Sequence, residues 1–132
     1  MKLLVVDDQS PVGEIISRIA QQGGWQAIHT VSADRVDEII RAEAIDVLLI
    51  DFAVDGAPNP HRNGLTIVRQ LRAQGLQTAV ILFTGWPDLV DRAEAKKLGI
   101  IEVMEKPLGI QELRKALANA LKAVQTAAEP LG

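Results

Sequence analysis

The sequence predicts a doubly wound α/β domain, in which helices cover both faces of a five-stranded parallel sheet. Two observations predict it: short aliphatic runs alternate five times with stretches of helical spacing, and three of these runs are continuously apolar. A strand that is apolar at every position is typical of a parallel sheet, because helices cover both of its faces. Repeated strand–helix alternation further implies right-handed crossover connections.

The five aliphatic runs are the expected strands, and turn or polar residues bound each of them. In chain order they are residues 3–6, 26–31, 47–50, 78–83 and 100–104. The first, the third and most of the fourth contain no polar residue, which suits strands buried on both faces.

Between these runs, apolar residues recur at spacings of three and four, as on one face of a helix. Ser10 is expected to cap the first helix, with Pro11 at the favoured first position, and Ser32 to cap the second. Gly75 and Gly99 are expected to end the third helix and a weaker fourth one. The inner faces are Ile15, Ile16 and Ile19; Val36, Ile39 and Ile40; Leu65, Val68 and Leu71; Leu89, Val90 and Ala93, with Leu98 as a weaker member; and Ile110, Leu113, Leu117, Leu121 and Val124.

Length and charge limit what the chain can be. Its 132 residues, 48% of them hydrophobic, suit one domain with one core, which we place at 1–124, with 125–132 as a tail or the start of a linker. The chain is thus either a complete single-domain protein or a piece of a longer one. A net charge of −3 gives no broad basic field for nucleic acid, and the absence of cysteine excludes disulfides and thiolate metal sites. The first apolar run is too short for a signal peptide or a membrane span, so we expect a soluble, cytoplasmic protein without membrane contact.

Ionisable and hydroxyl side chains stand at the carboxyl ends of several expected strands. Asp7 and Asp8 follow the first strand and Asp51 follows the third, while Thr84 and Lys106 follow the fourth and the fifth. In doubly wound sheets, ligands bind beyond these ends, where the strand order reverses. In the flavodoxin-like order 2-1-3-4-5, which is taken from known folds, the first and third strands are neighbours, so the three aspartates converge.

Three converging carboxylates repel one another, and a hard divalent cation relieves that repulsion. Oxygen ligands that leave room for water and phosphate suit Mg²⁺. Beside such an ion, Asp51 could attack an activated phosphoryl group and form an acyl phosphate, while Lys106 and Thr84 stabilise the phosphoryl oxygens. Each residue alone would more often be a turn or a strand exit. Their joint placement at one edge indicates a metal and phosphoryl site.

Four motifs resemble the signatures of two-component response-regulator receiver domains, the chemotaxis-type family with a flavodoxin-like fold. They are Val5-Val6-Asp7-Asp8, Leu48-Leu49-Ile50-Asp51, Leu82-Phe83-Thr84-Gly85 and Glu105-Lys106-Pro107-Leu108, in the family's order, and the likeness runs from about residue 1 to 124. The resemblance implies that Asp51 is the phosphoacceptor. It also implies that Asp7, Asp8 and Asp51 hold Mg²⁺ together with the backbone carbonyl of Ala53.

The same resemblance implies how the signal passes. Thr84 would hydrogen-bond the phosphoryl group in the active state, Lys106 would contact the phosphate, and the Lys106–Pro107 bond would be cis. A histidine kinase or histidine phosphotransfer protein would supply the phosphoryl group, and the chain would catalyse only its own phosphorylation and acyl-phosphate hydrolysis. A downstream protein would bind the fourth helix, fifth strand and fifth helix. Family members often dimerise on phosphorylation.

Two features depart from the family pattern, and Trp86 is expected near the mouth of the site. Receivers usually carry an aromatic residue three positions before the lysine, and Val103 stands there, which puts the usual threonine–aromatic coupling in question. Trp86 either shapes access of the phosphodonor or water, or contacts a partner from an exposed loop. The loop 51–64 is longer than usual by about five residues, and forms either a partner-specific lid or a tolerated surface insertion.

Two other functions stay open. A receiver-like module could work by binding alone, which Val103 and the long loop favour and the complete acid site disfavours. A metal-dependent phosphohydrolase would need a cap and an Asp-x-Asp nucleophile on the first strand, and neither is found in the sequence. His29, expected on the edge strand opposite the site, and His61, in the long loop, are given no catalytic role.

Overall fold

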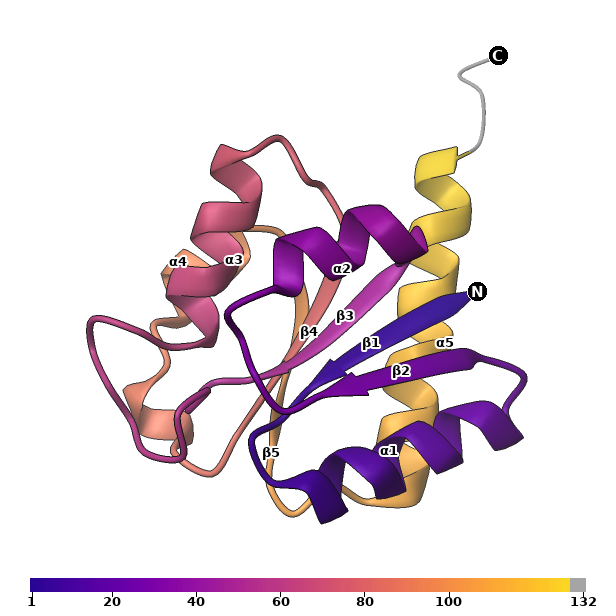
Figure 1. Ribbon diagram of the computed structural model, residues 1–132, viewed down its shortest axis with the longest axis horizontal. Helices are drawn as coiled ribbons and strands as arrows, with labels where there is room; N and C mark the ends of the chain where they lie inside the picture. Colours follow the sequence, from indigo (N-terminus) through magenta and orange to yellow (C-terminus); the bar gives the residue numbers. More distant parts are fainter. Residues whose placement is uncertain (129–132) are drawn as a thin grey trace.

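The computed structural model describes residues 1–128 and contains a five-stranded parallel sheet between two layers of helices (Figure 1). The strands are β1 (Lys2–Val6), β2 (Gln26–Thr30), β3 (Val47–Asp51), β4 (Ala79–Thr84) and β5 (Ile100–Glu105). Their order is β2-β1-β3-β4-β5, which confirms the predicted fold. The chain order reverses between β1 and β3, so the carboxyl ends of these two strands flank the switch point.

The two helical layers divide the core in two. The helices are α1 (Ser10–Gln22), α2 (Val36–Glu43), α3 (Gly64–Ala73), the 3₁₀ turn η1 (Pro87–Leu89), α4 (Arg92–Lys97) and α5 (Ile110–Ala128). α1 and α5 cover one face of the sheet, and α2, α3 and α4 cover the other (Figure 1). Within residues 1–128, no helix is both long enough and apolar enough to cross a membrane.

Strand β3 shows how the core fixes the position of Asp51. Leu48 and Ile50 pack under α2, α3 and α4, whereas Val47 and Leu49 pack under α1 and α5, and all four are fully buried. Burying each such side chain contributes about 1.5–3 kcal/mol. A slip of one residue would exchange the two faces, so the register is strongly fixed and Asp51 is held at the strand end.

Two expected helix caps are wrong. α1 begins at Ser10 itself, with Gln9 as the N-cap residue and Pro11 in the first turn. α2 begins at Val36, and the Ser32 hydroxyl instead accepts a hydrogen bond from the Asp34 amide at 3.1 Å. Serine hydroxyls bond nearby amides in turns as readily as at helix starts, so the residue type alone does not locate a cap.

The fourth helix is shorter than expected. Pro87 opens the turn η1, Val90 is extended, and Asp91 caps α4 by accepting a hydrogen bond from the Glu94 amide at 3.0 Å. The residues Leu89 and Val90 therefore precede α4. At the other end of the chain, α5 continues to Ala128, and the remainder of the expected tail, 129–132, lies outside the described residues.

Three residues assigned to inner helix faces are more than half exposed: Ile15, Leu89 and Ile110. In α1, Ile16 points into the core, and a neighbouring residue lies about 100° away around a helix. Ile15 therefore faces outward while Ile16 is buried. The apolar stripe of α1 is wider than the face that the sheet covers, which leaves an apolar surface beside the site described next.

Candidate functional site

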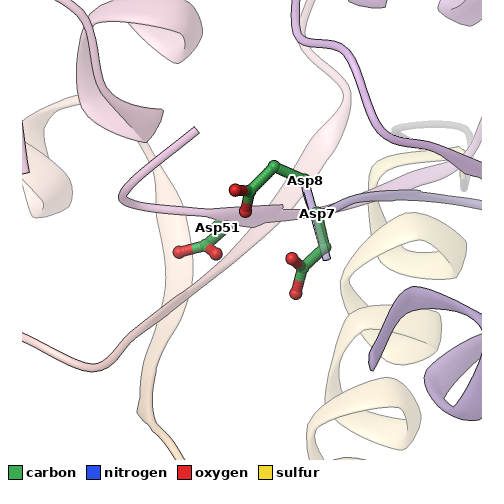
Figure 2. Close-up of side chains that lie close together, drawn as sticks. All are labelled: Asp7, Asp8 and Asp51. Carbon is green, nitrogen blue, oxygen red and sulfur yellow. The ribbon is translucent and has the colours of Figure 1, made fainter. Parts of the chain in front are cut away.

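Asp7, Asp8 and Asp51 come together at the carboxyl ends of β1 and β3 (Figure 2). Carboxylate oxygens of the three residues lie within 4.8 Å of one another. The sheet causes this convergence, because Val6 pairs with Ile50 in register and the next residue of each strand reaches the same edge. The predicted clustering of the three aspartates is thus present in the structure.

Asp7 is the most deeply buried of the three acids, with no exposed surface. Its Oδ1 accepts a hydrogen bond from the Gln9 amide at 2.8 Å, whereas no donor among the described residues reaches Oδ2. Lys106 Nζ stays 3.8 Å from that oxygen. Burial raises the pKa of Asp7 above its usual value of 3.8, and the Gln9 amide and Lys106 only partly offset this.

Asp51 has a partner for each carboxylate oxygen. Oδ1 accepts a hydrogen bond from the Ala53 amide at 3.0 Å, and Oδ2 pairs with Lys106 Nζ at 2.7 Å. Burial nevertheless raises the pKa of Asp51, because the loss of hydration outweighs the attraction of Lys106 and the Ala53 amide. Protein groups thus hold the carboxylate in place without fully replacing its hydration.

Lys106 reaches the acids from the end of β5. Its amide donates to the Thr84 carbonyl at 2.8 Å, which continues the pairing of β4 and β5, and its peptide bond to Pro107 is cis, as expected. Nζ also lies 4.8 Å from the centroid of the Phe83 ring. Such a cation–π contact contributes about 0.5–1 kcal/mol where water is near. The ring thus supports the ammonium group beside Asp51.

The donor set fits a hard divalent cation. It consists of oxygen atoms, it carries an excess of negative charge, and one of its buried oxygens, Asp7 Oδ2, lacks a donor within residues 1–128. An ion at this position would supply the missing partner. The Ala53 carbonyl already accepts a hydrogen bond from the Gly56 amide at 3.1 Å, but a carbonyl oxygen has a second lone pair for a further contact.

Thr84, Trp86 and Val103 lie around the end of β4. Thr84 is fully buried, and its hydroxyl oxygen accepts a hydrogen bond from the Trp86 amide at 2.8 Å, which leaves the hydroxyl proton available to donate. Trp86 is 40% exposed. Val103 pairs with Leu82 in register and packs, partly buried, against the core under α3 and α4. An aliphatic side chain therefore occupies the position of the usual aromatic residue.

The loop between β3 and α3 is anchored at both ends. Phe52 and Val54 are buried in the core under α2, α3 and α4. Asn63 and Thr66 form a capping box at the start of α3, in which each side chain accepts a hydrogen bond from the other residue's amide. These contacts give the loop a defined path although it is longer than usual.

The middle of this loop lies against the acid cluster. Gly56 has a φ of +89°, and a Cβ atom there would come within 2.9 Å of Asp8 Oδ2. Arg62 pairs with Asp55 of the same loop at 3.0 Å and with Asp34, which precedes α2, at 2.6 Å. The loop thus borders Asp8 and is joined to a second loop of the same edge.

His29 lies beside the site, so its expected place opposite the site is wrong. Its Nε2 is 3.1 Å from the carbonyl oxygen of Asp7. β2 runs parallel to β1, and the carboxyl ends of both strands therefore meet at one edge of the sheet. The predicted parallel sheet and the position of His29 near the end of its strand together could have indicated that His29 lies at the same edge as the site. His61 is exposed in the long loop, where its amide donates a hydrogen bond to Asn59 Oδ1 at 2.9 Å.

A doubly wound parallel sheet with three clustered carboxylates at its switch point, which could hold a metal ion, defines the class of this protein. Its family follows from comparison with known proteins. A family model for the response regulator receiver domain matches residues 3–118, and the chain belongs to this family, whose members are the receivers of two-component response regulators.

Several curated proteins are similar over most of the chain. Sporulation initiation phosphotransferase F of Bacillus subtilis is 26% identical over 120 residues, which are 91% of this chain and 93% of that protein. The TorCAD operon transcriptional regulatory protein TorR of Escherichia coli is 28% identical over 90% of this chain. The transcriptional regulatory protein DltR of Streptococcus agalactiae is 28% identical over 86% of it. The chain spans about half the length of TorR (49%) and of DltR (48%).

Solved structures agree with the family. A response regulator receiver domain protein from Clostridium thermocellum is 28% identical and superposes with a TM-score of 0.80, covering 96% of this chain and 98% of the other. A CheY-like receiver domain protein from Methanospirillum hungatei shares the fold at a TM-score of 0.82 with 17% identity, over 96% of this chain and 98% of that one.

Proposed function

We propose that this chain is a phosphorylation-controlled switch in which Asp51 accepts a phosphoryl group from the phosphohistidine of a histidine kinase or a phosphotransfer protein. The observation that carries the proposal is the pairing of Asp51 Oδ2 with Lys106 Nζ at 2.7 Å, next to Asp7 Oδ2, which no hydrogen-bond donor within residues 1–128 reaches. One carboxylate is thereby oriented, and a place for a cation is left beside it.

Asp7, Asp8, Asp51 and the carbonyl of Ala53 would hold Mg²⁺, which neutralises charge on the phosphoryl oxygens. A carboxylate oxygen of Asp51 forms the new bond to phosphorus while the bond from phosphorus to the donor's imidazole nitrogen breaks. Lys106 stays close enough to follow the charge from the carboxylate to the phosphoryl oxygens, and Thr84 donates its hydroxyl proton to one of them.

An apolar groove beside Lys106 supports a protein as the phosphodonor. It lies between α1 and the start of α5 and encloses about 480 Å³. Its lining includes Val12, Ile15, Leu108, Phe83 and Lys106. Ile15 is 57% exposed there. A helix that carries a phosphohistidine could pack its apolar side chains in this groove while the phosphoryl group reaches Asp51.

Incubation with Mg²⁺ and acetyl phosphate, followed by intact-mass measurement, tests the proposal. The wild-type chain is expected to gain one phosphoryl group, and Asp51→Asn is expected to gain none. Asp55→Asn is the matched control, because Asp55 lies in the same loop, is exposed and pairs with Arg62. Labelling of Asp51→Asn at the wild-type level would disprove the proposal.

We further propose that output passes to a protein target through α4, β5 and α5, with a homodimer as one state of the phosphorylated chain. The domain itself would comprise 1–124 with 125–132 as a tail, and the switch would act in the cytoplasm of the cell without binding nucleic acid. Exposed Lys96 and Lys97 on α4 offer contacts for an acidic partner.

The alternative, a receiver that works by binding alone, is favoured by one observation. Val103 packs as an aliphatic core residue, so no aromatic ring is present there to change place with Thr84. Mg²⁺ with beryllofluoride, a phosphoryl mimic, separates the two functions through Trp86 fluorescence. The Trp86 amide donates a hydrogen bond to the Thr84 hydroxyl, so a movement of Thr84 on switching should change the emission of Trp86. Unchanged emission together with unchanged target binding would favour the alternative.

A further inference from the structure

His29 on strand β2 contacts the backbone of Asp7, the first residue of the acid cluster. It pairs with Val5 in register, and its side chain lies on the sheet face that α1 covers. Nε2 lies 3.1 Å from the Asp7 carbonyl oxygen. A carbonyl oxygen only accepts hydrogen bonds, so Nε2 must carry a proton and donate it.

Gly13 in α1 makes room for the His29 ring. A Cβ atom at position 13 would collide with three atoms of that ring, Nε2, Cδ2 and Cε1. Gly13 has no positive φ, so the glycine is required here by space and not by backbone conformation. A glycine inside a helix costs about 0.5–1 kcal/mol relative to alanine. Helix α1 is therefore less stable at the position where the His29 ring approaches Asp7 than it would be with alanine there.

Three hydrogen bonds hold the turn that carries the first two acids. The Asp7 amide donates to the Thr30 carbonyl at 3.2 Å, the Asp7 carboxylate accepts from the Gln9 amide at 2.8 Å, and the Asp7 carbonyl accepts from His29. The bond from His29 is made by a side chain, so a single substitution can remove it while the two bonds from backbone amides remain.

We propose that His29, in the space left by Gly13, is a positioning residue for the acid pair. Its bond to the Asp7 carbonyl fixes the peptide between Asp7 and Asp8, and with it the directions in which the two carboxylates leave the chain. Asp7 Oδ2, which no hydrogen-bond donor within residues 1–128 reaches, then stays available to a divalent cation. The inference deepens the proposed function and rests on it in one respect, the binding of a cation by these acids.

The size of the effect follows from contacts of the same kind. Removing a hydrogen bond that orients a metal ligand typically costs about 10–100-fold in metal affinity. Here the bond acts on the backbone of the ligand residue rather than on its carboxylate. The expected loss is therefore smaller than that range, at about 3–10-fold.

Titration of the full chain with Mg²⁺ at one fixed pH, followed by calorimetry or by tryptophan fluorescence, tests this inference. His29→Phe keeps a ring in the space and loses the donor, so its Mg²⁺ affinity should fall by about 3–10-fold. His29→Gln places an amide N–H near the position of Nε2 and should recover most of the affinity. His61→Phe, at the chain's other histidine, is the matched control and should bind as the wild type does.

A second variant reaches the same bond from the helix. Gly13→Ala displaces the His29 ring without touching an acid, so it should weaken Mg²⁺ binding about as much as His29→Phe does. The double variant Gly13→Ala/His29→Phe should bind Mg²⁺ no more weakly than Gly13→Ala or His29→Phe alone, because each substitution removes the same bond. Urea unfolding without metal shows that each variant is folded at the temperature of the titration.

The outcomes are distinct from those of the proposed function. Wild-type Mg²⁺ affinity in both His29→Phe and Gly13→Ala, with only the stability changed, would show a packing residue and overturn the inference. Equal weakening in His29→Gln and His29→Phe would overturn it as well. Labelling by acetyl phosphate at saturating Mg²⁺ should persist in His29→Phe. If the proposed function were wrong, Asp51→Asn would instead be labelled as the wild type is.

Discussion

Two aspartate–cation pairs at the same edge of the sheet have nearly equal lengths, but the pKa of the aspartate is shifted in opposite directions in the two pairs. Lys106 Nζ lies 2.7 Å from Asp51, and Arg62 Nη2 lies 2.6 Å from Asp34. The Asp51 side chain is 3% exposed, whereas that of Asp34 is 68% exposed. Burial raises the pKa of Asp51 despite its partner, while the hydrogen bond from Arg62 lowers the pKa of Asp34.

The difference shows that loss of hydration, and not the length of the pair, decides the direction in which the pKa of a paired carboxylate shifts. Asp34 keeps its water and gains a partner, so ionisation becomes easier, but a surface pair of this kind stabilises little. Asp51 has lost its water and regained only part of that solvation from Lys106 and the Ala53 amide. Its charged form benefits from any further cation, which is the property that a metal-assisted nucleophile needs.

Removing the cation that pairs with the buried carboxylate should have the largest effect on stability. Lys106→Met leaves Asp51 and Asp7 without their nearest positive charge, and we expect the metal-free protein to lose about 2 kcal/mol of unfolding free energy at neutral pH. Urea unfolding with and without Mg²⁺ measures this, and Mg²⁺ should restore part of the loss. Arg62→Met is the matched control at the exposed pair and should lose much less. Equal losses would show that burial does not separate the two pairs.

Neutralising the buried acid should act in the opposite direction. In metal-free protein, Asp7→Asn removes a charge that has no exposed surface, and we expect a gain of about 1–2 kcal/mol in unfolding free energy at neutral pH. The gain depends on pH because the pKa of Asp7 is raised. The stability contributed by this carboxyl is fully present below 3.8 and is lost as the pH rises through the folded-state pKa.

The difference in unfolding free energy between Asp7→Asn and the wild type should therefore be absent in acid. It should widen as the pH rises through the folded-state pKa of Asp7. Thermal or urea unfolding over a pH series measures it. Mg²⁺ should also stabilise the variant less than the wild type, since a proposed ligand of the ion is lost. A gap that narrows with rising pH would contradict the raised pKa.

Asp34→Asn should give the smallest effect and the reverse dependence on pH. The pKa of Asp34 is lowered, so its ionised form contributes stability that is present above 3.8 and lost as the pH falls through the folded-state pKa. The variant should be slightly less stable than the wild type at neutral pH and equal to it in strong acid. High salt should reduce the difference, because both partners are exposed. An effect as large as that of Asp7→Asn would remove the distinction between the pairs.

The strands could be predicted because local sequence determines them, and the acid cluster followed once the strand order was taken from known folds. The run ending in Leu48-Leu49-Ile50-Asp51 is apolar on both faces up to its last residue, so the strand and its exit were visible together. The starts of α2 and α4 were missed for the opposite reason. Ser32 and Leu89 fit a helix equally well by residue type, and turn hydrogen bonds and the 3₁₀ turn at Pro87 displaced both starts.

By itself, the sequence determined the order of the elements and the placing of Asp7, Asp51 and Lys106 at strand ends, since each follows from periodicity within a few residues. Only the tertiary structure decided which distant residues support them. His29 reaches Asp7 across 22 positions of the chain and needs Gly13 of α1 to do so, and Arg62 reaches Asp34 across 28. Such contacts depend on how helices and loops pack onto the sheet, and no local pattern encodes that packing.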